Sequence, residues 1–99
     1  MGGHYVYILY SAKLDKYYIG RTEDVELRLK FHNEPIESRK FTAKGIPWEL
    51  KIAIPCQSLD QATKLELFIK RMKSKRFVES IISSEELRND LLKKIAPDC

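Results

Sequence analysis

The chain contains 99 residues, the length of one domain, because two shorter pieces would each be too small to bury a useful core. Apolar residues make up 43% of the sequence, which excludes disorder as a description of the whole chain. Eighteen basic residues face fourteen acidic ones, and the net charge of +4 mildly favours polyanionic partners.

Cysteine usage and hydropathy narrow the class of protein further. Cys56 and Cys99 offer neither a disulfide framework nor a CxxC zinc motif, so a reducing compartment fits best. No apolar run has the length of a transmembrane helix, and the first residues lack the apolar region of a signal peptide. We therefore expect a cytoplasmic protein that does not enter a membrane.

The N-terminal segment predicts a β-hairpin. Residues 4–10, HYVYILY, are mostly aromatic or β-branched, and residues 16–20, KYYIG, form a second short run of the same kind. The short polar link between them favours antiparallel pairing. Tyr7 and Tyr18 lie on the same face in any register whose paired residue numbers sum to an odd value.

A helix is predicted after the hairpin. Thr22 is the expected N-cap, and Pro35 should end the helix near Asn33. The stripe expected at the sheet-facing side or its margin contains Val25, Arg28, Leu29 and His32. Residues 34–46 are polar and basic without periodicity, and predict a loop.

The alternation in residues 48–54, WELKIAI, predicts a strand with one buried face that ends at Pro55. Ser58 and Gln61 form a capping box at the start of a second long helix. The apolar stripe of that helix contains Ala62, Leu65, Ile69 and Met72.

The C-terminal part predicts further helix. Residues 74–82 either extend the second helix or form one of their own, and a last helix begins near Ser83 or Ser84. The order β-β-α-β-α-α predicts an α+β sandwich with a three-stranded sheet flanked by helices. We expect one domain over residues 1–99, with a core at about 4–75 and a helical extension at 76–99.

Several side chains are candidates for chemistry, although each has an ordinary structural explanation. Five tyrosines in the hairpin also suit the rim of a core. Arg28 either binds an anion or snorkels at a core edge, and His32 suits a helix C-terminus. Glu66 either forms an i,i+4 ion pair with Lys70 or holds Mg²⁺, which takes few protein carboxylates.

Together these segments resemble the GIY-YIG nuclease family. Val6-Tyr7-Ile8 resembles the first half of its signature, with Tyr5 in place of the Gly, and Tyr18-Ile19-Gly20 matches the second half. Ten residues lie between the two tyrosines, which is the spacing of the family. Further likenesses are YIGRTEDVELRLKFHN at 18–33, the strand start at 47–50, and the second helix at 62–70. The small stand-alone bacterial members, related to the N-terminal nuclease domain of the DNA-repair excinuclease, are the most similar in kind.

The resemblance implies a metal-dependent endonuclease that hydrolyses phosphodiester bonds, with DNA as the expected substrate. Glu66 would bind one divalent ion, Mg²⁺ or Mn²⁺, and Arg28 would hold the phosphate. Tyr18 would activate or position the attacking water, with Tyr7 hydrogen-bonded in the same constellation. Free tyrosine has a pKa of about 10, so Arg21 would have to lower the pKa of Tyr18, or Tyr18 would pass its proton to His32.

Basic side chains form two groups that either bind a phosphate backbone or are simply solvated. The candidates for nucleic-acid binding are Arg39, Lys40 and Lys44 in the expected loop, and Lys70, Arg71 and Lys73 in the second helix. Two alternatives stay open: a nucleic-acid-binding module of the same fold without activity, and an adaptor that binds an acidic partner. A protein partner that supplies specificity is also compatible with so short a chain.

Overall fold

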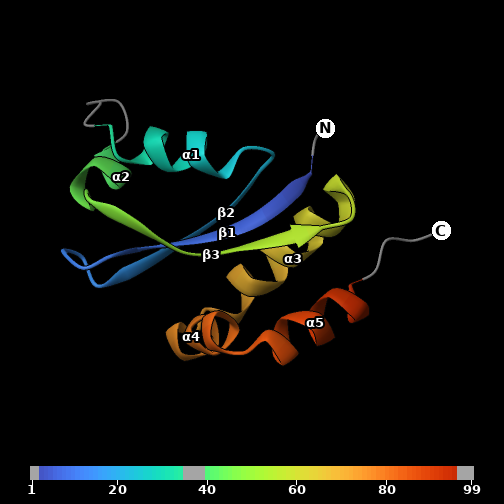
Figure 1. Cartoon of the computed structure of the whole chain (residues 1–99). Helices are drawn as coiled ribbons and strands as arrows, with labels where there is room; N and C mark the ends of the chain where they lie inside the picture. Colours follow the sequence, from blue (N-terminus) through green and yellow to red (C-terminus); the bar gives the residue numbers. More distant parts are fainter. Residues whose placement is uncertain (1–2, 35–39, 96–99) are drawn as a thin grey trace.

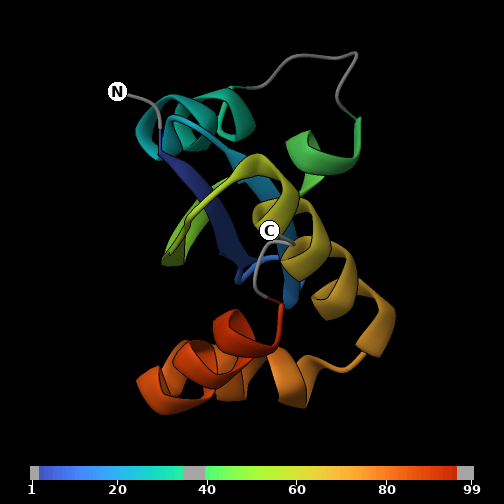
Figure 2. The ribbon, with the colours of Figure 1, turned by 90° about the vertical axis from the view of Figure 1, so that its right-hand side faces the viewer.

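The computed structural model describes residues 3–34 and 40–95, without the side chains of Lys40 and Phe41. Its sheet contains β1 (His4–Ser11), β2 (Lys16–Thr22) and β3 (Trp48–Cys56), in the order β2-β1-β3 with both pairings antiparallel. Two helices cover one face and three cover the other (Figures 1 and 2). The predicted α+β fold with a three-stranded antiparallel sheet is confirmed.

The hairpin register places the two signature tyrosines on one face. Tyr7 pairs with Gly20 and Leu9 pairs with Tyr18, so the paired residue numbers sum to an odd value. The condition for a shared face is therefore met, and the rings of Tyr7 and Tyr18 stack with centroids 6.3 Å apart.

Strand β3 differs from the prediction of one buried face. Its register with β1 shifts between Ile8 and Leu9, so that Lys51 is an extra residue in β3. Trp48 and Leu50 consequently join the cluster on one face, whereas Ile52 and Ile54 join the other. The prediction that Pro55 ends the strand was also wrong, since β3 continues to Cys56. A proline is tolerated there because β3 is an edge strand.

Helices α1 (Val25–His32) and α2 (Lys40–Lys44) lie on the same side of the sheet (Figure 1). The N-cap of α1 is Asp24, whose side chain accepts from the Leu27 N–H at 3.0 Å; the predicted cap, Thr22, belongs to β2. Helix α2 replaces part of the predicted loop, and Pro35 lies outside the described residues. The Asn33 side chain bridges both backbone polar groups of Trp48 and ties the end of α1 to β3.

The other face packs against α3 (Leu59–Met72), α4 (Lys75–Ser83) and α5 (Glu85–Lys94). Ser58 caps α3 as predicted, and α4 is a helix of its own because Lys73 turns into the left-handed region at φ 48°. Ser84 caps α5. The core on this face is formed by Val6, Ile8, Ile54, Ala62, Leu65, Ile69, Val78, Ile81 and Leu91.

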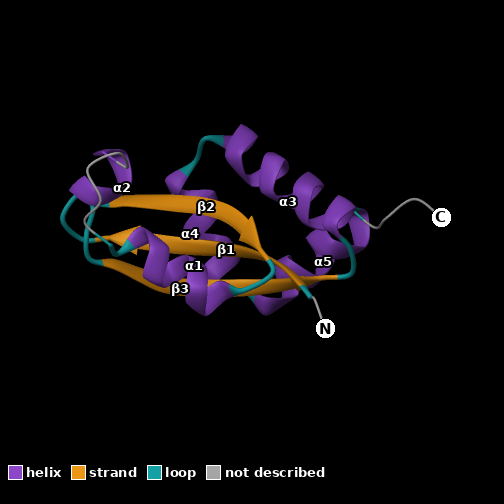
Figure 3. Cartoon of the chain, turned by 90° about the horizontal axis from the view of Figure 1, so that it is seen from above, coloured by secondary structure: helices purple, strands orange, loops and turns teal. Residues whose placement is uncertain are grey.

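Figure 3 shows α3 running alongside the β2 edge of the sheet. This arrangement places residues of β2 and α3 opposite one another at that edge. Within residues 3–34 and 40–95, none of the helices combines the length and apolar composition needed to cross a membrane.

Candidate active site

A buried hydrogen bond links the first signature tyrosine to α1. The Tyr7 hydroxyl lies 3.0 Å from Nε2 of His32, and both side chains are 3% exposed. Gly20 makes room for this contact, because a Cβ at that position would lie 2.5 Å from Tyr7 Oη. A glycine inside a strand often marks such a close approach.

Tyr18 lies beside this pair. Its ring is 4.5 Å from the His32 ring and 6.1 Å from the Trp48 ring, measured between centroids. The side chain is half-buried, whereas Tyr7 is buried. Tyr18 is therefore the more accessible of the two signature hydroxyls.

The charges around Tyr7 show which other groups lie near it. Burial raises the pKa of Tyr7 well above its ordinary value, and the neighbouring Tyr18 and the negative charge of Glu66 raise it further. The positive charge of Arg28 acts in the opposite sense, lowering this pKa. Tyr7 thus keeps its proton at neutral pH, and the two charged groups of the predicted constellation both act on its hydroxyl.

Glu66 sits on α3 with its side chain only 10% exposed. Oε1 accepts from Nη1 of Arg21 at 2.9 Å, and Oε2 accepts from Nζ of Lys70 at 2.7 Å. The ion pair with Lys70, expected from the i,i+4 spacing, is confirmed. A nearly buried carboxylate held from both sides is well fixed in position.

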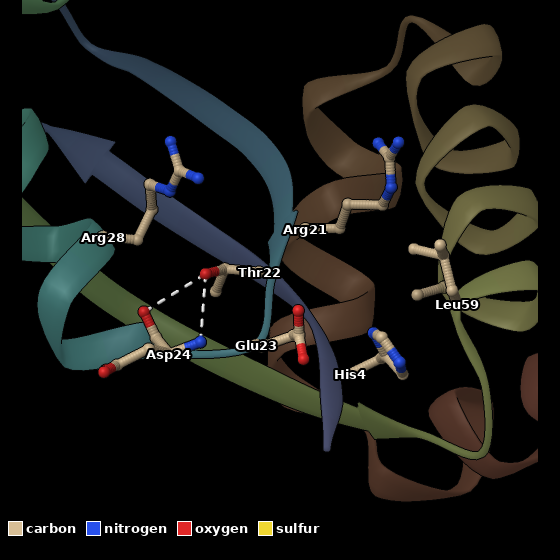
Figure 4. Close-up of a pocket in the computed structure, with 8 residues that line it drawn as sticks. His4, Arg21, Thr22, Glu23, Asp24, Arg28 and Leu59 are labelled. Carbon is tan, nitrogen blue, oxygen red and sulfur yellow. Dashed lines mark hydrogen bonds between the residues drawn. The ribbon is translucent and has the colours of Figure 1, made fainter. Parts of the chain in front are cut away.

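The structure places Arg21 differently from its suggested role beside Tyr18. Residues 18 and 21 are separated by an odd number along β2, so their side chains project from opposite faces of the strand. Figure 4 shows the Arg21 side chain extending from β2 towards α3. Its guanidinium pairs with Glu66, and it is this carboxylate, on the α3 side, that faces its positive charge.

Arg28 is exposed, at the margin of α1 rather than against the sheet. Its guanidinium carbon lies 5.2 Å from the centre of the Phe31 ring, and in the described part of the chain it forms no ion pair. Arg28 and Arg21 line one cleft of about 460 Å³ between α1, β2 and α3 (Figure 4). Two guanidinium groups in one cleft suit an anion such as phosphate.

Sequence reasoning did not single out several residues of this cleft. His4, Glu23 and Asp24 line it, and the hydroxyl of Thr22 accepts from the Asp24 N–H at 3.1 Å (Figure 4). Nothing in the pattern of residues marks His4 or Glu23. The proximity of Tyr7, by contrast, could have been expected from the glycine of Tyr18-Ile19-Gly20.

The predicted nucleic-acid-binding side chains do not form one group. Arg39 and the side chain of Lys40 lie outside the described part of the chain, and Lys70 is held by Glu66. The remaining predicted side chains, all exposed, are Lys44 on α2, Arg71 on α3 and Lys73 at its C-cap.

Among the described residues, no three His, Cys, Asp or Glu side chains are grouped so as to hold a metal ion. Glu66 is the carboxylate that lies between the tyrosine cluster and the arginine-lined cleft. A metal site here would therefore depend on one carboxylate, completed by water and by oxygens of a bound ligand.

Comparison with known proteins identifies this arrangement. The family model of the GIY-YIG catalytic domain matches residues 3–78, which run from β1 into α4. No curated protein and no solved structure gives a match. Nuclease activity is the general property of this domain, and its members generally use divalent metal ions. The chain belongs to the GIY-YIG family of catalytic domains.

Proposed function

We propose that this chain is a metal-dependent endonuclease that hydrolyses phosphodiester bonds, with DNA as its substrate. The carrying observation is the position of Glu66. It is nearly buried, fixed by Arg21 and Lys70, and close enough to Tyr7 for its charge to act on that hydroxyl. An exposed arginine, Arg28, opens from the same constellation into a cleft.

The residues present fit a single divalent ion. Mg²⁺ commonly takes one or two protein carboxylates and completes its shell with water and phosphate oxygens, so Glu66 alone is a sufficient protein ligand. Each carboxylate oxygen has two acceptor positions, and one bond per oxygen leaves room for a further partner. When bound, Mg²⁺ or Mn²⁺ supplies positive charge to the phosphate oxygens as negative charge develops.

The chain's own residues divide the remaining work. Arg28 binds the phosphate by charge-assisted hydrogen bonds from the open cleft. Tyr18, the more accessible tyrosine, positions the attacking water. Tyr7 keeps its proton and holds His32, whose Nε2 is the atom next to its hydroxyl. A proton released at the reaction centre has a path to His32 only through an atom near that bond.

The alternative is a nucleic-acid-binding module of the same fold. The observation that favours it is the pairing of both Glu66 oxygens with cations, which leaves the carboxylate without net charge to offer until one partner moves away. Both functions predict binding that weakens with salt. Cleavage that depends on a divalent ion separates them.

The test is cleavage of a labelled panel of single-stranded DNA, duplex, branched DNA and RNA, each with Mg²⁺, with Mn²⁺ and with chelator. Glu66→Gln and Arg28→Ala are compared with the wild type, and Glu86→Gln on α5 is the matched control for loss of one carboxylate. The proposal expects metal-dependent cleavage that both site variants reduce by at least about a hundredfold, as removal of a transition-state contact does. Absence of cleavage from every substrate, with binding retained, would instead establish the binding module.

A further inference from the structure

A second hollow, of about 300 Å³, lies outside the site described above. It is bounded by the start of β2, the C-terminal end of α3 and the start of α4. Four apolar or aromatic side chains line it: Tyr17, Ile19, Ile69 and Val78. A small pocket with an apolar lining suits a flat, partly apolar group such as a nucleobase.

The same hollow carries a concentration of positive charge. Its lysines are Lys16, Lys70, Lys73 and Lys75, and its one carboxylate is that of Asp15. Lys75 pairs with Asp15 at 2.7 Å, and Lys70 pairs with Glu66. In the described chain, Lys16 and Lys73 form no ion pair, so they hold the charge available to a ligand.

The backbone at the hollow is held in an unusual conformation. Among the described non-glycine residues, only Asp15 (φ 52°) and Lys73 (φ 48°) have positive φ, and both line the hollow. The C-cap position of a helix is normally filled by glycine or asparagine when φ is positive. A lysine there carries a conformational cost that glycine would avoid, and in return it presents a cation to the hollow.

Lys70 connects this hollow with the candidate active site, since it lines the hollow while its Nζ contacts Glu66. Glu66 and Lys73 are seven residues apart, about 10 Å along the helix axis at about 1.5 Å per residue. A stacked strand rises about 3.4 Å per nucleotide, so this distance corresponds to about three nucleotides. One strand can therefore occupy both places.

We propose that this hollow, named here the flanking pocket, binds one unpaired nucleotide of the substrate strand. The base rests on Tyr17 and its apolar neighbours, and the phosphate contacts Lys16 and Lys73. The inference rests on the proposed nuclease function and specifies its substrate class. The enzyme acts on strands that are single or unpaired a few nucleotides from the scissile phosphate, because a paired and stacked base has no access to the pocket.

The test measures binding of a fluorescent single-stranded oligonucleotide by anisotropy in the presence of chelator, so that cleavage plays no part. The flanking-pocket variant is Lys16→Gln with Lys73→Asn, since asparagine tolerates positive φ. The control, Lys93→Gln with Lys94→Gln on α5, removes the same charge elsewhere. We expect about tenfold weaker binding and a salt slope lower by about 1.4 in the pocket variant alone, at about 0.7 per phosphate contact.

A second measurement uses the unaltered protein and so is independent of folding defects. Single abasic sites are moved along the oligonucleotide, and binding should weaken at one position only, a loss that disappears in the pocket variant. Equal binding by the pocket variant and the control, or no position-specific effect of abasic sites, would overturn the inference. Cleavage that persists alongside that result leaves the nuclease proposal standing, whereas a bound but uncut strand with the expected position effect removes the nuclease proposal and keeps the pocket.

Discussion

The contact between Gly20 and Tyr7 gives the sharpest prediction for stability. In Gly20→Ala, the added Cβ would lie 2.5 Å from Oη and 2.7 Å from Cζ of Tyr7, both closer than real Cβ contacts. The ring has no free space to move into, because it is 3% exposed and its hydroxyl is bonded to His32. Relief of the clash must therefore displace the ring and break that hydrogen bond.

The magnitude follows from three effects. Overpacking costs about 1–3 kcal/mol and the lost hydrogen bond about 1 kcal/mol, while removing glycine from a strand returns about 0.5–1 kcal/mol. We expect the free energy of unfolding to fall by about 2 kcal/mol. Urea unfolding, followed by the fluorescence of the single tryptophan, Trp48, measures it directly.

Two further variants make the test specific. Gly3→Ala is the matched control, because its Cβ would come no closer than 3.2 Å, to the side chain of Tyr5. In the Tyr7→Phe background Gly20→Ala should cost less, since the nearest atom is gone. A change of under about 0.5 kcal/mol in Gly20→Ala, or equal costs in both backgrounds, would refute the reasoning.

Two other predictions concern stability. Asn33→Ala removes two hydrogen bonds, to the N–H of Trp48 at 2.6 Å and to its carbonyl at 3.1 Å, and should cost about 2 kcal/mol in urea unfolding, whereas Asn89→Ala on α5 should cost little. The raised pKa of Tyr7 means that the unfolded chain loses this proton from about pH 10 while the folded chain retains it, so stability should fall as pH rises above about 10. Relative to Tyr7→Phe, the fall should be at most about 1.4 kcal/mol per pH unit, and parallel urea midpoints for both proteins from pH 9 to 11 would contradict it.

The hairpin and the helix caps were largely predictable because their signals are local. The β-branched and aromatic runs predict both strands, and Ser58 with Gln61 predicts the start of α3, where the Gln61 N–H donates to the Ser58 hydroxyl at 3.1 Å. The cap of α1 was predicted two residues early, since both Thr22 and Asp24 can accept from backbone N–H groups, and both do. Competition between two good caps is not resolved by sequence alone.

The division of β3 between two faces could not be predicted from its alternation. Trp48, Leu50, Ile52 and Ile54 alternate regularly, yet the extra residue at Lys51 sends two of them to each face. The bulge follows from pairing with β1 and from helices on both sides of the sheet, which are tertiary facts. The burial of Glu66 is likewise tertiary, since helical spacing places it only at the margin of an apolar stripe.

The surroundings of Glu66 suggest why its two cations are the exposed members of the cluster. The carboxylate is 10% exposed, whereas Arg21 and Lys70 are 43% and 49% exposed. Removing the partners from a buried charge costs about 3–5 kcal/mol, so both cations stay on Glu66 until another positive charge takes their place. Once replaced, each cation returns to water at little cost, or moves to a phosphate in the adjoining cleft or flanking pocket. The proposed site thus couples the charge state of one carboxylate to the availability of two phosphate-binding side chains.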